Sequence, residues 1–152
     1  MIALLYTRYY TLIMITINYL PILVASLVAF GLSSLWFSPI LFGNEWLAER
    51  KISLEKIGQG SIKSYSLIKS YTIQIIFTLI TFAVLGFIIS VSTQANGSDG
   101  AFLGFLSWLG FILPNSVYGF LWKRESLTLV LIESINYLII LTIGGAIIGA
   151  WN

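Results

Sequence analysis

The sequence contains neither cysteine nor histidine, and only 9% of its residues are charged. Without these two side chains, disulfide bonds, thiol redox chemistry, imidazole-bound metals and histidine acid–base catalysis are excluded. A soluble domain carries roughly 25% charged residues, so eight Lys and Arg with six Asp and Glu are too few to solvate 152 residues. Hydrophobic residues make up 58%, and the mean hydropathy is +0.94. The composition predicts a membrane protein and excludes a soluble enzyme, a nucleic-acid binder and a disordered tail.

The charges are clustered, and the uncharged intervals between the clusters are long enough for membrane spans. A helix needs about 20 apolar residues to cross the hydrocarbon, and continuous runs without period-two alternation favour helices over barrel strands. We therefore predict an all-α membrane protein, a single domain (1–152) of four transmembrane helices in an antiparallel bundle. The predicted spans are 18–38, 69–91, 101–122 and 126–150. The remaining segments are an aromatic, basic interfacial stretch (1–17), a basic loop (43–68) and an outer loop (92–100).

The distribution of basic residues predicts the orientation. The 43–68 loop and the 123–125 turn hold most of the Lys and Arg, so the positive-inside rule makes both cytoplasmic and puts both termini outside, in a prokaryotic plasma membrane. Within the loop, residues 44–51 suit a short helix with Asn44 as its N-cap. Several aromatic side chains are expected only to anchor the helices at the two interfaces: Trp36, Phe37, Tyr65, Trp122 and Trp151.

A short motif closes the first span. It reads Leu35-Trp36-Phe37-Ser38-Pro39, then Leu41-Phe42-Gly43 and Trp46. Its characteristic positions are Trp36, Pro39, Phe42, Gly43 and Trp46. The motif resembles that of the domain of unknown function 1761 family, and the glycine-rich third and fourth spans are similar to it as well, over residues 18–151. The resemblance implies four membrane helices and no particular activity, so it implies no catalytic residues.

The last two spans form a tight hairpin, and its spacing predicts which residues meet. Asn115 and Glu133 are each nine residues from Arg124, about 13 Å into the bilayer. Gly104 and Gly144 are each twenty residues from it. We therefore expect these pairs to face each other, because small residues let membrane helices approach closely. Gly100–Gly104 and Gly145–Gly149 are GxxxG matches, which in lipid-facing positions would instead mediate homodimerisation.

Glu133 is the most informative polar residue, because an acid within a span is costly to insert. Three arrangements would offset that cost: a neutral side chain hydrogen-bonded to Asn115, a pair with Lys69 reaching inward, or a wet cavity open to the cytoplasm. Gln74 belongs to a polar stripe on the second span. Pro114 lacks an amide donor and leaves the Gly110 carbonyl free near Asn115. The candidate polar site between the second, third and fourth spans is Glu133, Asn115, Gln74, Lys69 and Tyr137.

These residues leave two functions open. The first is a structural or accessory membrane protein, a homo-oligomer or a subunit of a larger assembly, in which the polar groups fix helix register. The second is a small transporter for a proton, cation or polar solute that uses Glu133. An enzyme is not expected, because a carboxylate pair or an activated serine would need a second positioned group. No cofactor, metal or nucleic-acid partner is expected, and the lipid bilayer is the one partner that the composition requires.

Overall fold

The computed structural model describes residues 18–52, 64–92 and 96–151, and these residues form helices joined by short turns. The predicted interfacial stretch 1–17 and part of the basic loop lie outside the described residues. Four helical stretches are long and apolar enough to cross a membrane, which confirms the all-α, four-span prediction. The elements are α2 (Tyr19–Trp36), α3 (Gly43–Glu49), α5 (Ser64–Val91), α6 (Gly97–Ser107), the π-helix η1 (Trp108–Ile112), α7 (Leu113–Trp122) and α8 (Leu127–Ala150).

Polar side chains at the helix starts set the boundaries. Asn18 caps α2 by accepting from the amide of Leu20. Asn96 and Asp99 form a reciprocal capping box, so α6 begins at Gly97 and the third span starts four residues before the predicted 101. Ser126 caps α8 through the amide of Leu129. The predicted N-cap Asn44 is wrong: α3 begins at Gly43, because the preceding turn already provides its first carbonyl acceptors.

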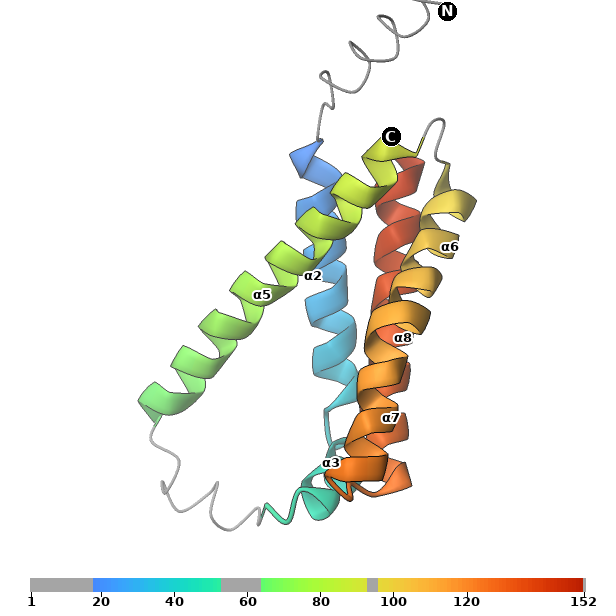
Figure 1. The fold of residues 1–152 in the computed structure, drawn as a ribbon. Coiled ribbons are helices and arrows are strands. Elements are labelled where there is room, and N and C mark those ends of the chain that lie inside the picture. The colour runs from blue at the N-terminus through green and yellow to red at the C-terminus, as the bar shows by residue number, and fades with distance from the viewer. Residues whose placement is uncertain (1–17, 53–63, 93–95, 152) are drawn as a thin grey trace, which may run out of the picture.

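The helices form an antiparallel bundle that is closed at one end only (Figure 1). The start of α2 and the end of α8 lie at the same end, and α5 crosses the other helices diagonally and meets them near its C-terminus. The buried core follows this geometry, since its α5 members begin at Phe82. The core residues are Ile22, Ala25, Ala29, Phe82, Leu85, Ile89, Ile140, Leu141 and Ile148.

Glycines bring α6 and α8 into backbone contact. A Cβ added at Gly100 would collide with the Gly145 carbonyl, and one at Gly145 would collide with the Gly100 carbonyl. A Cβ at Gly149 would lie 3.0 Å from the Gly100 Cα atom. The two GxxxG matches therefore pack against each other within the chain, as small residues do where membrane helices approach closely.

The predicted facing of Gly104 and Gly144 is wrong. A Cβ at Gly104 would meet the Leu141 carbonyl, and a Cβ at Gly144 would meet the ring of Phe82 on α5. The physical reason is the π-turn η1, in which the amide of Leu113 donates to the Trp108 carbonyl five residues back. Such a turn changes the phase of a helix, so counting equal distances from Arg124 gives the wrong register.

Candidate functional site

The family-like motif forms the turn that joins α2 to α3. The ring of Trp36 lies 4.5 Å from that of Phe42, centroid to centroid, and the ring of Phe37 lies 5.7 Å from that of Trp46. Gly43 is buried, and a Cβ there would lie 2.7 Å from the Ser38 carbonyl carbon. The motif therefore builds a compact corner that fixes the direction in which α3 leaves the first span.

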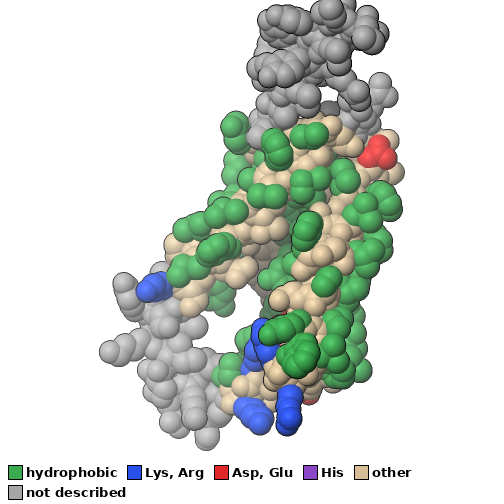
Figure 2. Space-filling view, viewed as in Figure 1, with side chains coloured by type: hydrophobic (Ala, Val, Ile, Leu, Met, Phe, Trp, Pro, Cys, Tyr) green, Lys and Arg blue, Asp and Glu red, His purple; other side chains and the backbone are tan. Residues whose placement is uncertain are grey.

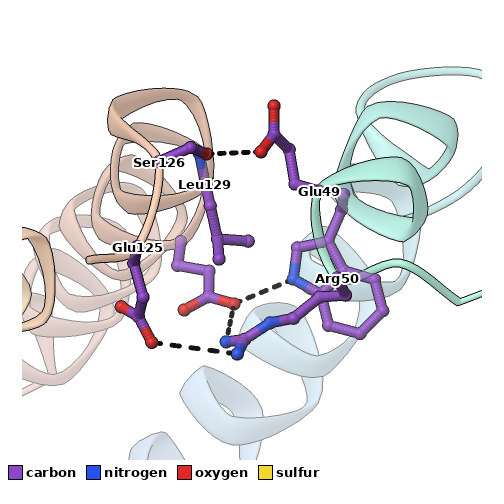
Figure 3. Close-up of polar contacts among 7 residues, drawn as sticks. Glu49, Arg50, Glu125, Ser126 and Leu129 are labelled. Atoms are coloured by element: carbon purple, nitrogen blue, oxygen red, sulfur yellow. Dashed lines mark hydrogen bonds and ion pairs between the residues drawn. The ribbon is translucent and has the colours of Figure 1, made fainter. Parts of the chain in front are cut away.

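The corner turns one face of α3 toward α8. Trp46, Glu49 and Arg50 are spaced i, i+3 and i+4, which places them on one side of a helix. The Ser126 hydroxyl donates to Glu49 Oε2 at 2.5 Å, and Ser126 is itself the N-cap of α8. Figure 3 shows Glu49 and Arg50 extending from the same stretch of backbone toward Ser126 and Glu125. This spacing was the signal in the sequence that could have identified the three residues as a binding face.

Glu133 is the centre of this arrangement. Its Oε1 atom accepts from the Trp46 indole nitrogen at 2.9 Å and from Arg50 Nη2 at 2.5 Å. The Arg50 Nη1 atom also lies 3.9 Å from Glu125 Oε1. The side chains of Arg50 and Glu133 are 37% and 29% exposed, so the pair is partly solvated and not sealed in a core. We call this set the α3–α8 contact: Trp46, Glu49, Arg50, Glu125, Ser126 and Glu133.

The cation that pairs with Glu133 corrects the sequence expectation. One of the three expected arrangements pairs Glu133 with Lys69, but Lys69 is exposed at the start of the second span and does not line the site. Arg50 reaches Glu133 because the motif corner folds α3 under α8. Glu133 lies at the end of the second turn of α8, and the predicted distance of about 13 Å is counted from Arg124, before the helix begins. It is the seventh residue of α8, about 9 Å from the helix start at 1.5 Å per residue.

A cavity of about 320 Å³ opens beside the ion pair. Asn115, Glu133 and Tyr137 all line it, so the structure brings three of the five predicted site residues together. No hydrogen bond joins Asn115 to Glu133 among the described residues, because the carboxylate binds Trp46 and Arg50 instead. The complete lining is Arg50, Ile112, Asn115, Ser116, Lys123, Glu125, Val130, Glu133 and Tyr137.

Gln74 does not belong to the cavity. Its side chain is exposed on α5, and its amide lies 3.5 Å from the Thr78 hydroxyl one turn later on the same helix. The Thr78 hydroxyl in turn donates to the Gln74 carbonyl. Gln74 and Thr78 of the predicted polar stripe thus bond to each other along α5. The N-terminal half of α5 diverges from the bundle (Figure 1).

Sequence reasoning missed a second set of polar contacts, which other elements make with the α8 residues on either side of Glu133. The Trp36 indole donates to the Ile132 carbonyl at 3.0 Å, and the Trp108 indole donates to the Ser134 carbonyl at 2.9 Å. The amide oxygen of Asn136, which is buried, accepts from the Ser33 hydroxyl at 3.1 Å. Trp36 therefore binds inside the bundle, and the prediction that it only anchors an interface is wrong. Tyr65, also predicted as an anchor, lies where side chains are not described.

The chemistry available at this site is binding and ion pairing. Two cations and two carboxylates converge at the cavity: Arg50, Lys123, Glu125 and Glu133. Within residues 18–52, 64–92 and 96–151, no group of three or more acidic side chains is placed to hold a metal ion. The arrangement suits a helix-to-helix contact, or a polar solute carrying both charges.

Comparison with known proteins gives one match. The family described as Protein of unknown function (DUF1761) matches residues 20–149. The match includes the α2–α3 corner, both halves of the α3–α8 contact and all the residues that line the cavity. No curated protein and no solved structure matches the chain. The resemblance seen in the Trp36–Trp46 motif is confirmed over nearly the whole chain, which therefore belongs to the DUF1761 family.

Proposed function

We propose that this protein is a structural or accessory membrane protein, whose role is to bind a partner. In this proposal the short helix α3 is held against the last span. The observation that carries the proposal is the set of hydrogen bonds that Glu133 accepts. Among the residues that the structure describes, Glu133 is the one carboxylate that lies beyond the first turn of a span, and its Oε1 atom already accepts from Trp46 and Arg50. A carboxylate held by an arginine and an indole is suited to fixing α3 in place.

The proposal includes a location and a partner class. Lys and Arg side chains lie toward the end of the bundle that holds α3 and the α7–α8 turn, and an acidic side chain lies at the opposite end (Figure 2). Asp99, in the first turn of α6, is a described acid at that end. By the positive-inside rule this distribution supports a cytoplasmic α3, with both termini outside, in a prokaryotic plasma membrane. The exposed apolar side chains of α5 suit contact with lipid or with another membrane helix, and the proposed partner is therefore a second copy or another membrane subunit.

One observation favours transport as a second candidate. The cavity beside Glu133 is large enough for several water molecules, and a carboxylate that faces a wet cavity is typical of proton and cation pathways. In that case, Arg50 would have to leave Glu133 during each transport cycle.

Two substitutions and their combination test whether the Arg50–Glu133 pair fixes α3. Arg50→Glu alone and Glu133→Arg alone place like charges together, so both should lower the stability of the protein in detergent, measured by denaturant unfolding. The double variant restores an ion pair and should recover part of that loss, because the pair fixes α3. The Trp46 hydrogen bond is not restored, so recovery should be incomplete.

Flux measurements on proteoliposomes complete the test. The accessory role predicts that wild-type vesicles carry no more proton or potassium flux than empty vesicles. A flux that is present in wild type and lost in Glu133→Gln would overturn the accessory role and establish transport, since that variant keeps the hydrogen-bond acceptors for Trp46 and Arg50.

A further inference from the structure

The face of α8 that holds Glu133 points toward α5. Glu133, Tyr137, Ile140 and Gly144 are spaced i, i+4, i+7 and i+11, which is one face of a helix. At the upper end of this face, a Cβ on Gly144 would collide with the Phe82 ring of α5. Lower down, Glu133 and Tyr137 line the cavity. The same face therefore meets α5 at one end and opens into the cavity at the other.

The matching face of α5 is uncovered at that lower end. Tyr71, Ile75 and Thr78 precede Phe82 at helical spacing, so they continue the face that packs on α8. Phe82 is fully buried, yet Ile75 is 43% exposed and Tyr71 is 59% exposed. Figure 2 shows the resulting hollow between the lower half of α5 and the rest of the bundle. We call this hollow the α5 groove, with Tyr71, Ile75 and Thr78 on its α5 side.

The cavity carries charges of both signs, and Arg50 is already paired with Glu133 and lies 3.9 Å from Glu125. Arg50 and Lys123 supply two positive charges, and Glu125 and Glu133 supply two negative charges. Both hydrogen bonds to Glu133 reach its Oε1 atom, so Oε2 can accept from a ligand. The Asn115 amide and the Tyr137 hydroxyl add neutral donors. A ligand that carries one phosphate and one primary ammonium could pair its phosphate with Lys123 and donate from its ammonium to Glu125 and to the Glu133 Oε2 atom.

We propose that the cavity and the α5 groove together bind one aminophospholipid with a phosphoethanolamine headgroup. Lys123 and Asn115 hold the phosphate, the Glu133 and Glu125 carboxylates accept from the ammonium, and an acyl chain lies in the α5 groove. Glu133 is about 9 Å from the start of its helix, so the charged cavity lies near one end of the last span.

The headgroup chemistry predicts an order of preference. A primary ammonium donates hydrogen bonds to carboxylates, whereas the quaternary ammonium of a choline lipid has no N–H to donate. An anionic glycerol lipid brings a phosphate without a cation, so it places a negative charge beside Glu125 and Glu133 and offers no donor to the Glu133 Oε2 atom. The site should therefore prefer phosphatidylethanolamine over phosphatidylcholine and phosphatidylglycerol. This inference rests on the membrane location and is independent of the accessory role.

Native mass spectrometry of the full chain tests this proposal with the three lipids supplied at equal concentration. We expect phosphatidylethanolamine to be retained at least fivefold over the other two lipids, and Lys123→Gln to reduce its retention about tenfold. Arg124→Gln is the matched control, because Arg124 is the adjacent exposed cation and does not line the cavity. Neither variant touches Trp46 or Arg50, so a failure here leaves the α3–α8 contact intact.

Two further arms keep the test decisive. Ile75→Trp fills the α5 groove without changing a charge and should also reduce retention, even if Lys123→Gln folds poorly. Soluble phosphoethanolamine should compete only weakly, since it lacks the acyl chain. Equal retention of the three lipids, or unchanged retention in both Lys123→Gln and Ile75→Trp, would overturn the proposal. Competition by phosphoethanolamine as strong as by the lipid would assign the cavity to a free solute instead.

Discussion

Individual tryptophans contribute more to this protein than membrane anchoring. Three indole N–H groups, from Trp36, Trp46 and Trp108, donate to Ile132, Glu133 and Ser134, three consecutive residues of α8. Each indole approaches from a different element, so the three together hold α2, α3 and η1 around one short part of α8. Because the indole N–H is a donor with no acceptor role, each of these contacts can be removed by a single substitution to phenylalanine.

Trp46→Phe should weaken the fold by about 1 kcal/mol, because the hydrogen bond is to a carboxylate that remains partly solvated. Packing of the aromatic ring on Phe37 is largely kept. The measurement is the free energy of unfolding in mixed micelles. Trp122→Phe is the control, since its side chain is 75% exposed and should change stability little. Equal effects of the two substitutions would show that the indole–carboxylate bond contributes nothing.

At the scale of elements, close backbone approach organises the pairing of α6 with α8. Gly100, Gly104 and Gly145 are buried where the two helices touch, and an added Cβ at any of them would meet a backbone carbonyl. A backbone carbonyl cannot move aside as a flexible side chain can, so the helices would have to separate. By contrast, a Cβ on Gly31 of α2 has no atom within 4 Å.

Gly104→Ala and Gly31→Ala should therefore have opposite effects on stability. We expect Gly104→Ala to destabilise by about 1–3 kcal/mol through overpacking. Gly31→Ala should be neutral or stabilise by up to about 1 kcal/mol, because alanine favours a helix over glycine. Denaturant unfolding of both variants measures the difference. A Gly104→Ala protein as stable as Gly31→Ala would contradict the packing of α6 on α8.

The elements themselves could be predicted from the sequence, whereas their phase and tilt could not. Uncharged intervals set the spans because hydrophobic length is a local property, and all four were predicted. The π-turn at Trp108–Ile112 depends on tertiary packing, so the predicted facing of Gly104 and Gly144 was wrong. Asn115 and Glu133 do share a cavity. The Arg50–Glu133 pair joins residues 83 positions apart, and only the geometry of the α2–α3 corner brings them together.

At the scale of the whole molecule, the bundle is closed at one end and open at the other. Glycine contacts and the core at Phe82, Leu85 and Ile89 hold the closed end. At the open end, α5 diverges (Figure 1), and the first and last spans are joined there by the α3–α8 contact together with the direct hydrogen bonds Trp36–Ile132 and Ser33–Asn136. The cavity, the family motif and the described charged residues other than Asp99 lie together at the open end.

The central claim is that α3 is held against the start of α8, and cysteine crosslinking in membranes tests it most directly. The chain has no cysteine, so introduced pairs give an unambiguous signal. Glu49→Cys with Ser126→Cys replaces two side chains that touch, and we predict rapid crosslinking by a short bifunctional thiol reagent, which spans the gap left when the long Glu49 side chain is shortened. Ala48→Cys with Ser126→Cys, one residue away on an exposed position, should crosslink at least tenfold more slowly. Equal rates for the two pairs, with both cysteines reactive to a thiol reagent, would contradict the account.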